Sequence, residues 1–159
     1  MSDVANKLPT TSEFVARFKR KYPGTIGWRY LKNSEVVEKH LNPGEQVVYA
    51  FIAQKNDKLF QIFESAVVAL TTQRIIIGRK RVLFGYFIDS ITPDMFNDLK
   101  VTSGIFFGKV KIDTIKELVV LTDISKKALP ELYSKISNYM AYMKNKNSND
   151  SENRKETLQ

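Results

Sequence analysis

The hydrophobic pattern is clearest in the middle of the chain, where two runs rich in β-branched residues, 65–70 and 74–78, meet at a polar Thr-Thr-Gln-Arg corner. Runs of this kind joined by a short polar corner are typical of neighbouring antiparallel strands. They predict, together with similar runs on either side, seven strands at residues 45–52, 60–70, 74–78, 82–91, 99–103, 105–112 and 117–122. Seven short strands joined by tight turns favour a meander that closes into a barrel.

Two other segments have the spacing of amphipathic helices. Beyond residue 123, an apolar stripe predicts a helix of about five turns that begins near Lys126. The stripe consists of Leu129, Leu132, Tyr133, Ile136, Met140 and Met143. Near the N-terminus, Thr10 and Glu13 have capping-box spacing at the start of a helix over 10–22, and a short helix is expected at 34–41.

These elements divide the chain into three parts. Residues 1–44 form a helical N-terminal extension, and residues 45–146 form the barrel with its C-terminal helix. Residues 147–159 are predicted to be a disordered tail, because they are almost all polar and have little apolar surface to bury. The predicted fold class is mainly β with α: a seven-stranded, partly open antiparallel barrel capped by a helix.

Composition indicates the cellular compartment of the protein and the charge of its binding partners. The chain has 159 residues, a formal net charge of +8 and a pI near 9.6, which favours contact with nucleic acid, a membrane surface or an acidic protein. It has no cysteine, its N-terminus lacks the apolar core of a signal peptide, and no run is long enough to span a membrane. We therefore expect a cytoplasmic protein without thiol chemistry.

Three motifs resemble the bacterial pleckstrin-homology-like (PH-like) domains, and the YokE-like branch in particular. They are Glu45-Gln-Val-Val-Tyr49, the Leu70-Thr-Thr-Gln-Arg-Ile-Ile76 corner and the Ser103-Gly-Ile-Phe-Phe-Gly-Lys-Val-Lys-Ile112 hairpin. The resemblance covers residues 42–144 and implies two near-orthogonal sheets of four and three strands, with the C-terminal helix plugging one open end. It implies no single activity, since PH-like folds host lipid-binding, peptide-binding and structural roles.

Similarity to the eukaryotic members of this fold also bears on lipid recognition. Those domains bind phosphoinositides with a basic first hairpin and an arginine on the second strand. Here the second strand begins Leu-Phe-Gln-Ile-Phe at residues 59–63 and contains no arginine. Because the bidentate phosphate ligand is missing, no specific phosphoinositide site is expected.

Basic residues in two turns form the first candidate site. Alternate turns of a meander lie at the same end of the sheet, so Lys55 and Lys58 should lie near Arg79, Lys80 and Arg81. Converging cations raise the local potential, and this set is a candidate anion- or partner-binding rim. The alternative is that these cations protect exposed turns and edges against aggregation.

The N-terminal helix carries a second candidate surface. Phe14, Phe18 and Tyr22 are four residues apart and share one face of the predicted helix. This stripe could mediate self-association, pack on its own domain or lie on an anionic membrane.

The sequence contains no recognisable catalytic, metal or cofactor site. His40 is the single histidine and has no acidic partner at ligand spacing, and Asp89, Asp94 and Asp98 match no calcium-loop pattern. Arg74 lies between two buried runs and is expected to satisfy carbonyl groups rather than a phosphate. Catalytic nucleophile motifs, phosphate loops and dinucleotide fingerprints are all missing.

We therefore predict a non-enzymatic interaction or assembly module, without a cofactor, that self-associates or binds a protein partner. The main alternative is peripheral binding to an anionic membrane through the basic rim. Nucleic-acid binding is a weaker alternative, because the basic turns are expected to lack interleaved exposed aromatic side chains.

Overall fold

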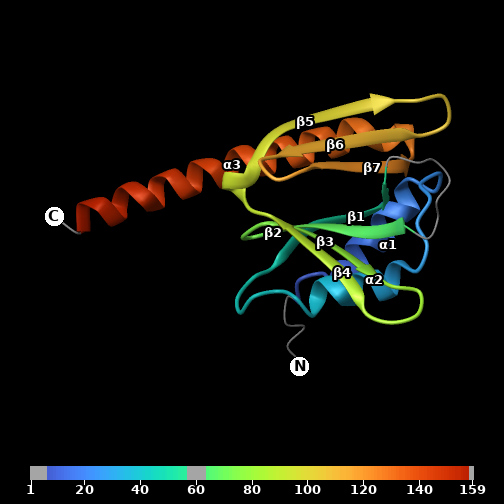
Figure 1. Ribbon diagram of the computed structural model, residues 1–159, viewed down its shortest axis with the longest axis horizontal. Coiled ribbons are helices and arrows are strands. Elements are labelled where there is room, and N and C mark those ends of the chain that lie inside the picture. Colours follow the sequence, from blue (N-terminus) through green and yellow to red (C-terminus); the bar gives the residue numbers. More distant parts are fainter. Residues whose placement is uncertain (1–6, 57–63, 158–159) are drawn as a thin grey trace, which may run out of the picture.

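The computed structural model describes residues 7–56 and 64–157, which form one seven-stranded antiparallel sheet with helices before and after it (Figure 1). The strands are β1 (Val47–Lys55), β2 (Ser65–Thr71), β3 (Ile75–Lys80), β4 (Tyr86–Ile91), β5 (Phe96–Ser103), β6 (Gly108–Thr114) and β7 (Leu118–Ile124). The helices are α1 (Thr11–Lys21), α2 (Tyr30–Glu38) and α3 (Leu129–Thr157), with short 3₁₀ turns η2 (Pro93–Met95) and η3 (Lys126–Ala128). The seven strands and the C-terminal helix confirm the predicted fold class.

The sheet consists of two half-sheets with a narrow join. Its strand order is β4-β3-β2-β1-β7-β6-β5. β1 pairs with β2 over most of its length, but it pairs with β7 only at Gln54 and Lys55, opposite Thr122 and Leu121. The order leaves β4 and β5 as the two edges, so the barrel is partly open and has the expected division into four and three strands.

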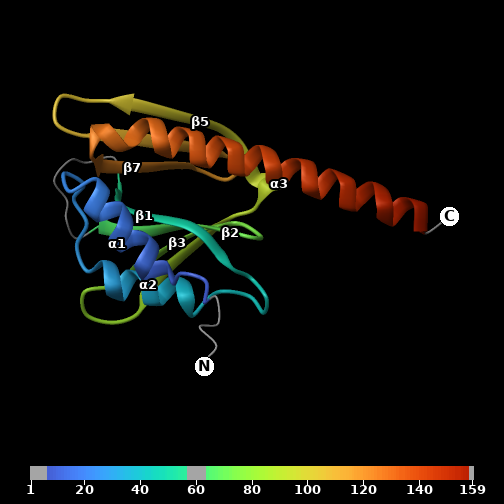
Figure 2. The same ribbon diagram turned by 180° about the vertical axis from the view of Figure 1, so that it is seen from behind.

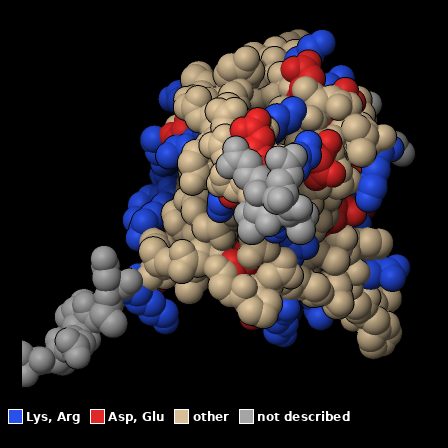
Figure 3. All heavy atoms as spheres, turned by 90° about the vertical axis from the view of Figure 1, so that its left-hand side faces the viewer, with Lys and Arg blue, Asp and Glu red and all other residues tan. Residues whose placement is uncertain are grey.

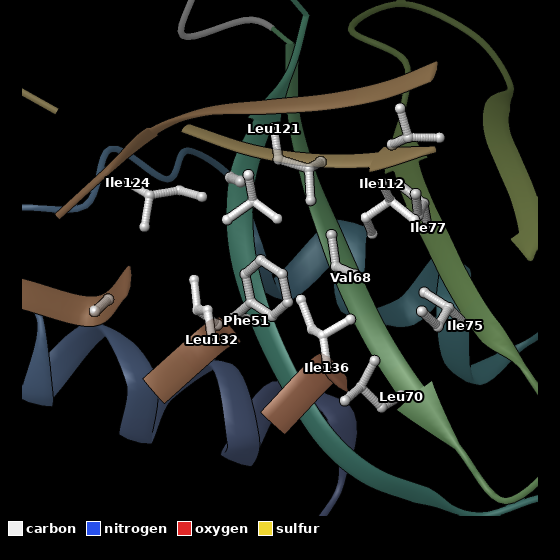
Figure 4. Close-up of a cluster of buried hydrophobic side chains, with 14 of the residues drawn as sticks. Phe51, Val68, Leu70, Ile75, Ile77, Ile112, Leu121, Ile124, Leu132 and Ile136 are labelled. Carbon is white, nitrogen blue, oxygen red and sulfur yellow. The ribbon is translucent and has the colours of Figure 1, made fainter. Parts of the chain in front are cut away.

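In the first half-sheet, β1 to β4, the central strands are largely buried on both faces, and β2 is buried at all of its positions. The edge strand β4 is buried only at Ile91. On the inner face, Phe51 and Val68 lie in one cluster with Leu132 and Ile136 of α3 (Figure 4). The outer-face cluster consists of Val15, Val37, Val47, Ala50, Ile52, Val67, Ala69 and Ile76. Helix α3 therefore plugs the barrel, while α1 and α2 cover the outer face of the first half-sheet (Figure 2).

In the N-terminal extension, the start of α1 agrees with the prediction, whereas α2 begins earlier in the chain than predicted. The side-chain oxygen of Thr10 accepts a hydrogen bond from the Glu13 amide at 3.3 Å, and the Glu13 carboxylate accepts one from the Thr10 amide, which completes the capping box of α1. Helix α2 begins at Tyr30 rather than at residue 34. The side-chain amide of Asn33 is buried and donates hydrogen bonds to the carbonyls of Trp28 and Ser65. Because these contacts satisfy its polar side chain, Asn33 can lie inside the helix instead of before its first turn.

Helix α3 differs from the prediction in two ways. Tyr133, which the predicted apolar stripe included, is 48% exposed because it lies beside the buried face of Leu132 and Ile136 rather than on it. The helix is also longer than predicted. It continues to Thr157 as an exposed helix that projects past the sheet, through the part of 147–159 that was predicted to be disordered (Figure 1). The prediction rested on the lack of apolar surface, but residues 144–157 contain no proline or glycine that would stop a helix already nucleated by the packed first turns. The division of the chain into three parts remains a prediction.

Candidate functional site

The β2–β3 corner is held by a buried ion pair. The carboxylate of Glu45 accepts hydrogen bonds from Arg74 Nε and Nη2, each at 3.1 Å, and from the Thr71 hydroxyl at 2.6 Å. It also accepts the Asn42 amide at 2.7 Å. Burial alone would raise the pKa of Glu45, but the hydrogen bonds from Arg74, Asn42 and Thr71 lower it below its ordinary value. We call Glu45, Thr71 and Arg74 the corner network.

Arg74 also donates two hydrogen bonds outside the corner network. Its Nη1 donates to the Ser90 hydroxyl and its Nη2 to the His40 carbonyl, both at 2.8 Å. The hydroxyl of Thr71 accepts the amides of Gln73 and Arg74, which fixes the turn. The Leu-Thr-x-x-Arg motif is therefore structural, as predicted for Arg74, whereas the part played by Glu45 was missed because its partner lies 29 residues away in sequence.

The predicted basic rim is only partly a free cationic surface. Lys55 forms an ion pair with Asp89, and Arg79 forms one with Glu64. Burial and the neighbouring Arg81 lower the pKa of Arg79. The Arg79–Glu64 pair connects the end of β3 with the start of β2, and the Lys55–Asp89 pair connects the end of β1 with β4. Together they neutralise two of the predicted cations.

The other members of the rim differ in their surroundings. Lys80 and Arg81 are exposed, and the Arg81 guanidinium lies 5.0 Å from the ring centre of Phe87. Lys58 lies outside the described residues.

The aromatic stripe of α1 faces the rest of the chain, with Phe18 and Tyr22 buried and Phe14 half-buried. Phe18 and Tyr22 belong to the inner core cluster, and Phe14 packs against the outer one. The Tyr22 and Tyr49 hydroxyls donate to Glu131 of α3, at 2.6 and 3.0 Å. The stripe is therefore not an exposed self-association surface in the folded chain. Sequence periodicity identified the face, but it could not say which surface covers it.

Glu131 ties three elements together. Its carboxylate accepts hydrogen bonds from the hydroxyls of Tyr22, at the end of α1, and Tyr49 of β1. It also forms an ion pair with Lys21 of α1. Burial alone would raise the pKa of Glu131, but the hydrogen bonds from Lys21, Tyr22 and Tyr49 lower it. This group is a structural clamp between α1, β1 and α3.

Two turns expose apolar side chains that were predicted to lie in strands. In the β3–β4 turn, Leu83 is 81% exposed and Phe84 is 85% exposed. In the β5–β6 turn, Ile105 is 84% exposed and Phe106 is 70% exposed. The predicted strands over 82–91 and 105–112 begin too early, since β4 starts at Tyr86 and β6 at Gly108.

The backbone explains these turns. Gly85 has a φ of +77°, and its carbonyl accepts the Arg81 amide, which closes the β3–β4 turn. The Gly104 amide donates to the Phe107 carbonyl at 2.8 Å and closes the β5–β6 turn. Gly104 marked the β5–β6 turn correctly, since the predicted strands stop at residue 103 and resume at 105, but the turn is longer than predicted. The β3–β4 turn was predicted at residues 79–81, whereas Arg79 and Lys80 lie in β3 and the turn is closed at Gly85.

Both turns lie at the end of the molecule opposite the projecting tip of α3 (Figures 1 and 2). We call residues 81–85 and 104–107, taken together, the turn end. A hollow of about 510 Å³ lies beside the β5–β6 turn, lined by Thr102, Gly104, Ile105, Phe106, Phe107, Gly108, Lys109 and Lys111. The Lys126 ammonium donates to the Ile105 carbonyl at 2.7 Å, so a cation lies against this turn as well.

The expectation that the basic turns lack exposed aromatic side chains is wrong. The basic β3–β4 turn does carry exposed aromatic side chains, namely Phe84, Tyr86 and Phe87. The face of Phe87 is occupied, however, because Arg79 and Arg81 lie 4.5 and 5.0 Å from its ring centre. The opposite end of the molecule, seen from the α3 tip in Figure 3, has basic and acidic side chains interspersed.

Among residues 7–56 and 64–157, no three His, Cys, Asp or Glu side chains come together in a way that could hold a metal ion. Within the same residues, no helix has both the length and the apolar character needed to cross a membrane.

Sequence comparison agrees with the fold and with the motifs at its corner. Comparison with curated protein sequences finds no match. Residues 41–138, more than half of the chain, match the family described as the bacterial PH domain. This range contains the corner network, all seven strands and the first turns of α3, including Leu132 and Ile136. The chain belongs to the bacterial PH domain family.

Proposed function

We propose that this protein is a non-catalytic cytoplasmic docking module of the YokE-like branch, and that its contact surface is the turn end. One observation carries the proposal: four large apolar side chains on two separate turns are at least 70% exposed at the same end of the molecule. Each turn presents two adjacent apolar side chains to solvent, and the two turns lie at separate corners of this end (Figure 1). Apolar side chains exposed next to one another mark binding surfaces in folded proteins.

Elsewhere in the described chain, the candidate polar groups are paired and most apolar side chains of the first half-sheet are buried. The polar groups that resemble a ligand site are satisfied inside the protein, as in the corner network and in the Lys55–Asp89 pair. The inner and outer cores bury the apolar faces of every strand of the first half-sheet except part of β4. Docking would cover the apolar side chains that folding leaves in water, at about 25 cal/mol per Å² of apolar surface.

Self-association is a second form of the same proposal. Since the α1 stripe faces the rest of its own chain, a second copy would use the turn end or the unpaired edges of β4 and β5. Light scattering of the full chain at tens of micromolar, compared with a Phe84→Ser variant, tests this form. A monomer in both samples would exclude it and leave docking to another partner.

The general proposal is tested by site-specific photo-crosslinking in cells that make the protein. A photoreactive residue replaces Phe84 or Phe106 at the turn end, and Tyr142 provides the control because it is an exposed aromatic residue on α3. We expect adducts, with protein or with lipid, at positions 84 and 106 and not at position 142. Equal adduct formation at all three positions, or none at 84 and 106, would overturn the proposal.

A further inference from the structure

We infer that the surface bound by the turn end is an anionic membrane, with the apolar tips of both turns inserted into the bilayer interface. This inference rests on the proposed docking function and names its partner. It follows from the shape of the apolar surface, the charges around it and the aromatic residue beside it.

The first argument is the shape. The apolar side chains belong to two separate tight turns, each closed by a backbone hydrogen bond and each projecting from the sheet. A protein partner would need two separate apolar pockets in one fixed arrangement to cover both tips. A bilayer interface accepts both without such a match, since insertion depends on buried apolar area rather than on a complementary shape.

The second argument is the charge of the collar around the tips. Lys80 and Arg81 are exposed at the start of the β3–β4 turn, and Lys126 lies against the β5–β6 turn. Among the described residues, the nearby carboxylates of Glu64 and Asp89 are already paired, with Arg79 and Lys55. The collar therefore has an excess of positive charge, which an anionic leaflet attracts.

The third argument is Trp28. It is the single tryptophan of the chain, and it is 39% exposed. The Arg29 guanidinium lies 5.0 Å from its ring centre and also donates to the Arg81 carbonyl, so this ring lies beside the β3–β4 turn. A partly exposed tryptophan next to cations is typical of side chains at membrane interfaces, where one part is apolar and the other is hydrated.

The aliphatic residues of the tips distinguish a membrane from a nucleic acid. Val82, Leu83 and Ile105 have no ring that could stack on a base, and the Phe87 face is covered by two guanidinium groups. Binding of single-stranded nucleic acid depends on free aromatic faces that follow the strand. The combination of aliphatic tips and a cationic collar fits lipid.

Flotation of the full-length protein with vesicles tests the inference. One set of vesicles contains phosphatidylcholine alone, and the other contains about 25% phosphatidylserine, so that surface charge is the difference. We expect strong binding to the charged vesicles, weak binding to the neutral ones, and a loss of binding between about 0.1 M and about 0.5 M salt. Phosphatidylglycerol in place of phosphatidylserine should bind equally, and binding to a single headgroup would contradict a contact of this general kind.

Matched variants locate the contact. Leu83→Ser with Phe84→Ser, or Ile105→Ser with Phe106→Ser, should weaken vesicle binding by about tenfold or more, because each pair removes two inserted side chains. Tyr142→Ser removes an equally exposed aromatic side chain from α3 and should leave binding unchanged. Circular dichroism verifies that each variant is folded.

Trp28 provides a direct readout of depth. Its emission should shift to shorter wavelength on charged vesicles and be quenched by lipids brominated in the upper acyl chain, and both changes should be lost in the Leu83→Ser, Phe84→Ser variant. Absence of vesicle binding, or binding that neither turn variant affects, would overturn the inference. Protein adducts at 84 and 106 without vesicle binding would refute the membrane partner while leaving the docking function intact, whereas the lack of both would refute both.

Discussion

The β2–β3 corner and the turn end use polar and apolar residues in opposite ways. At the β2–β3 corner, charged residues are buried and fully paired inside the protein. At the turn end, reached by following β3 to its other terminus, large apolar residues are exposed while the acids beside them are paired. The comparison shows that charge at a motif need not mark a ligand site, and that apolar sequence need not mark the core.

Disruption of the corner network should have the largest effect on stability. Arg74→Ala leaves the buried carboxylate of Glu45 without its cation, and we expect unfolding to become easier by about 3–5 kcal/mol. Urea denaturation measures the loss. The double variant Arg74→Met, Glu45→Gln serves as the control and should recover part of it, because it removes the unpaired charge; an unchanged midpoint for Arg74→Ala would show that the network is not structural.

Removing the plug of the barrel should have the next largest effect. Ile136 is fully buried beside Phe51 and Val68, and Ile136→Ala should lower the free energy of unfolding by about 2–5 kcal/mol. Leu132→Ala should behave in the same way. Chemical denaturation gives both values, with Tyr133→Ala, on the exposed side of the same helix, as the control. Equal losses from Ile136→Ala and Tyr133→Ala would contradict the assigned buried face.

The third prediction concerns acid. The pKa values of Glu45 and Glu131 are lowered in the folded state, so each contributes stability above its unfolded value near 4.5, and this stability is lost as the pH falls through the folded value. Thermal melts between neutral pH and about pH 3 should show a falling Tm below about pH 4.5. Glu131→Gln should make that fall shallower. A Tm that does not depend on pH in this range would refute the assignment.

The smallest effects are expected at the exposed sites. Leu83→Ser should change the free energy of unfolding by less than about 0.5 kcal/mol, because its side chain buries little in the folded chain. Removal of residues 147–159 should likewise change it by less than about 0.5 kcal/mol, since the described side chains of this segment are exposed. Urea denaturation of both variants checks the prediction, and a loss above 1.5 kcal/mol in either would show an unrecognised contact.

The sequence predicted the elements with strong local signals. The β-branched runs around the corner located β2 and β3, the spacing of Leu132 and Ile136 identified the buried face of α3, and Thr10 with Glu13 marked the start of α1. Each of these depends on periodicity or capping, which act over a few residues. The family match over 41–138 confirms the bacterial PH-like resemblance.

The candidate sites were harder to predict because they depend on contacts between distant segments. Local hydropathy cannot show that Phe18 is buried in the core while Phe84 is exposed to water. Phe18 is flanked by Arg17 and Lys19, whereas Phe84 lies in an apolar run, so the neighbouring residues favour the opposite assignment. In the same way, Glu45 resembles a solvent-exposed residue at the start of a strand until Arg74 is folded against it. Burial and pairing are tertiary properties, whereas the strands that carry them are local.

The narrow join between the half-sheets also bears on how this protein opens. Each half-sheet is formed by one continuous stretch of chain, 47–91 or 96–124, so nearly all strand pairing connects segments that are close in sequence. The pairing of Gln54 and Lys55 with β7 closes the one long loop in the sheet. Loop closure costs conformational entropy, and segments linked by few hydrogen bonds exchange their amide protons in separate cooperative units. Amides at this junction should therefore exchange with solvent sooner than those in the middle of β2, and the barrel should open there first.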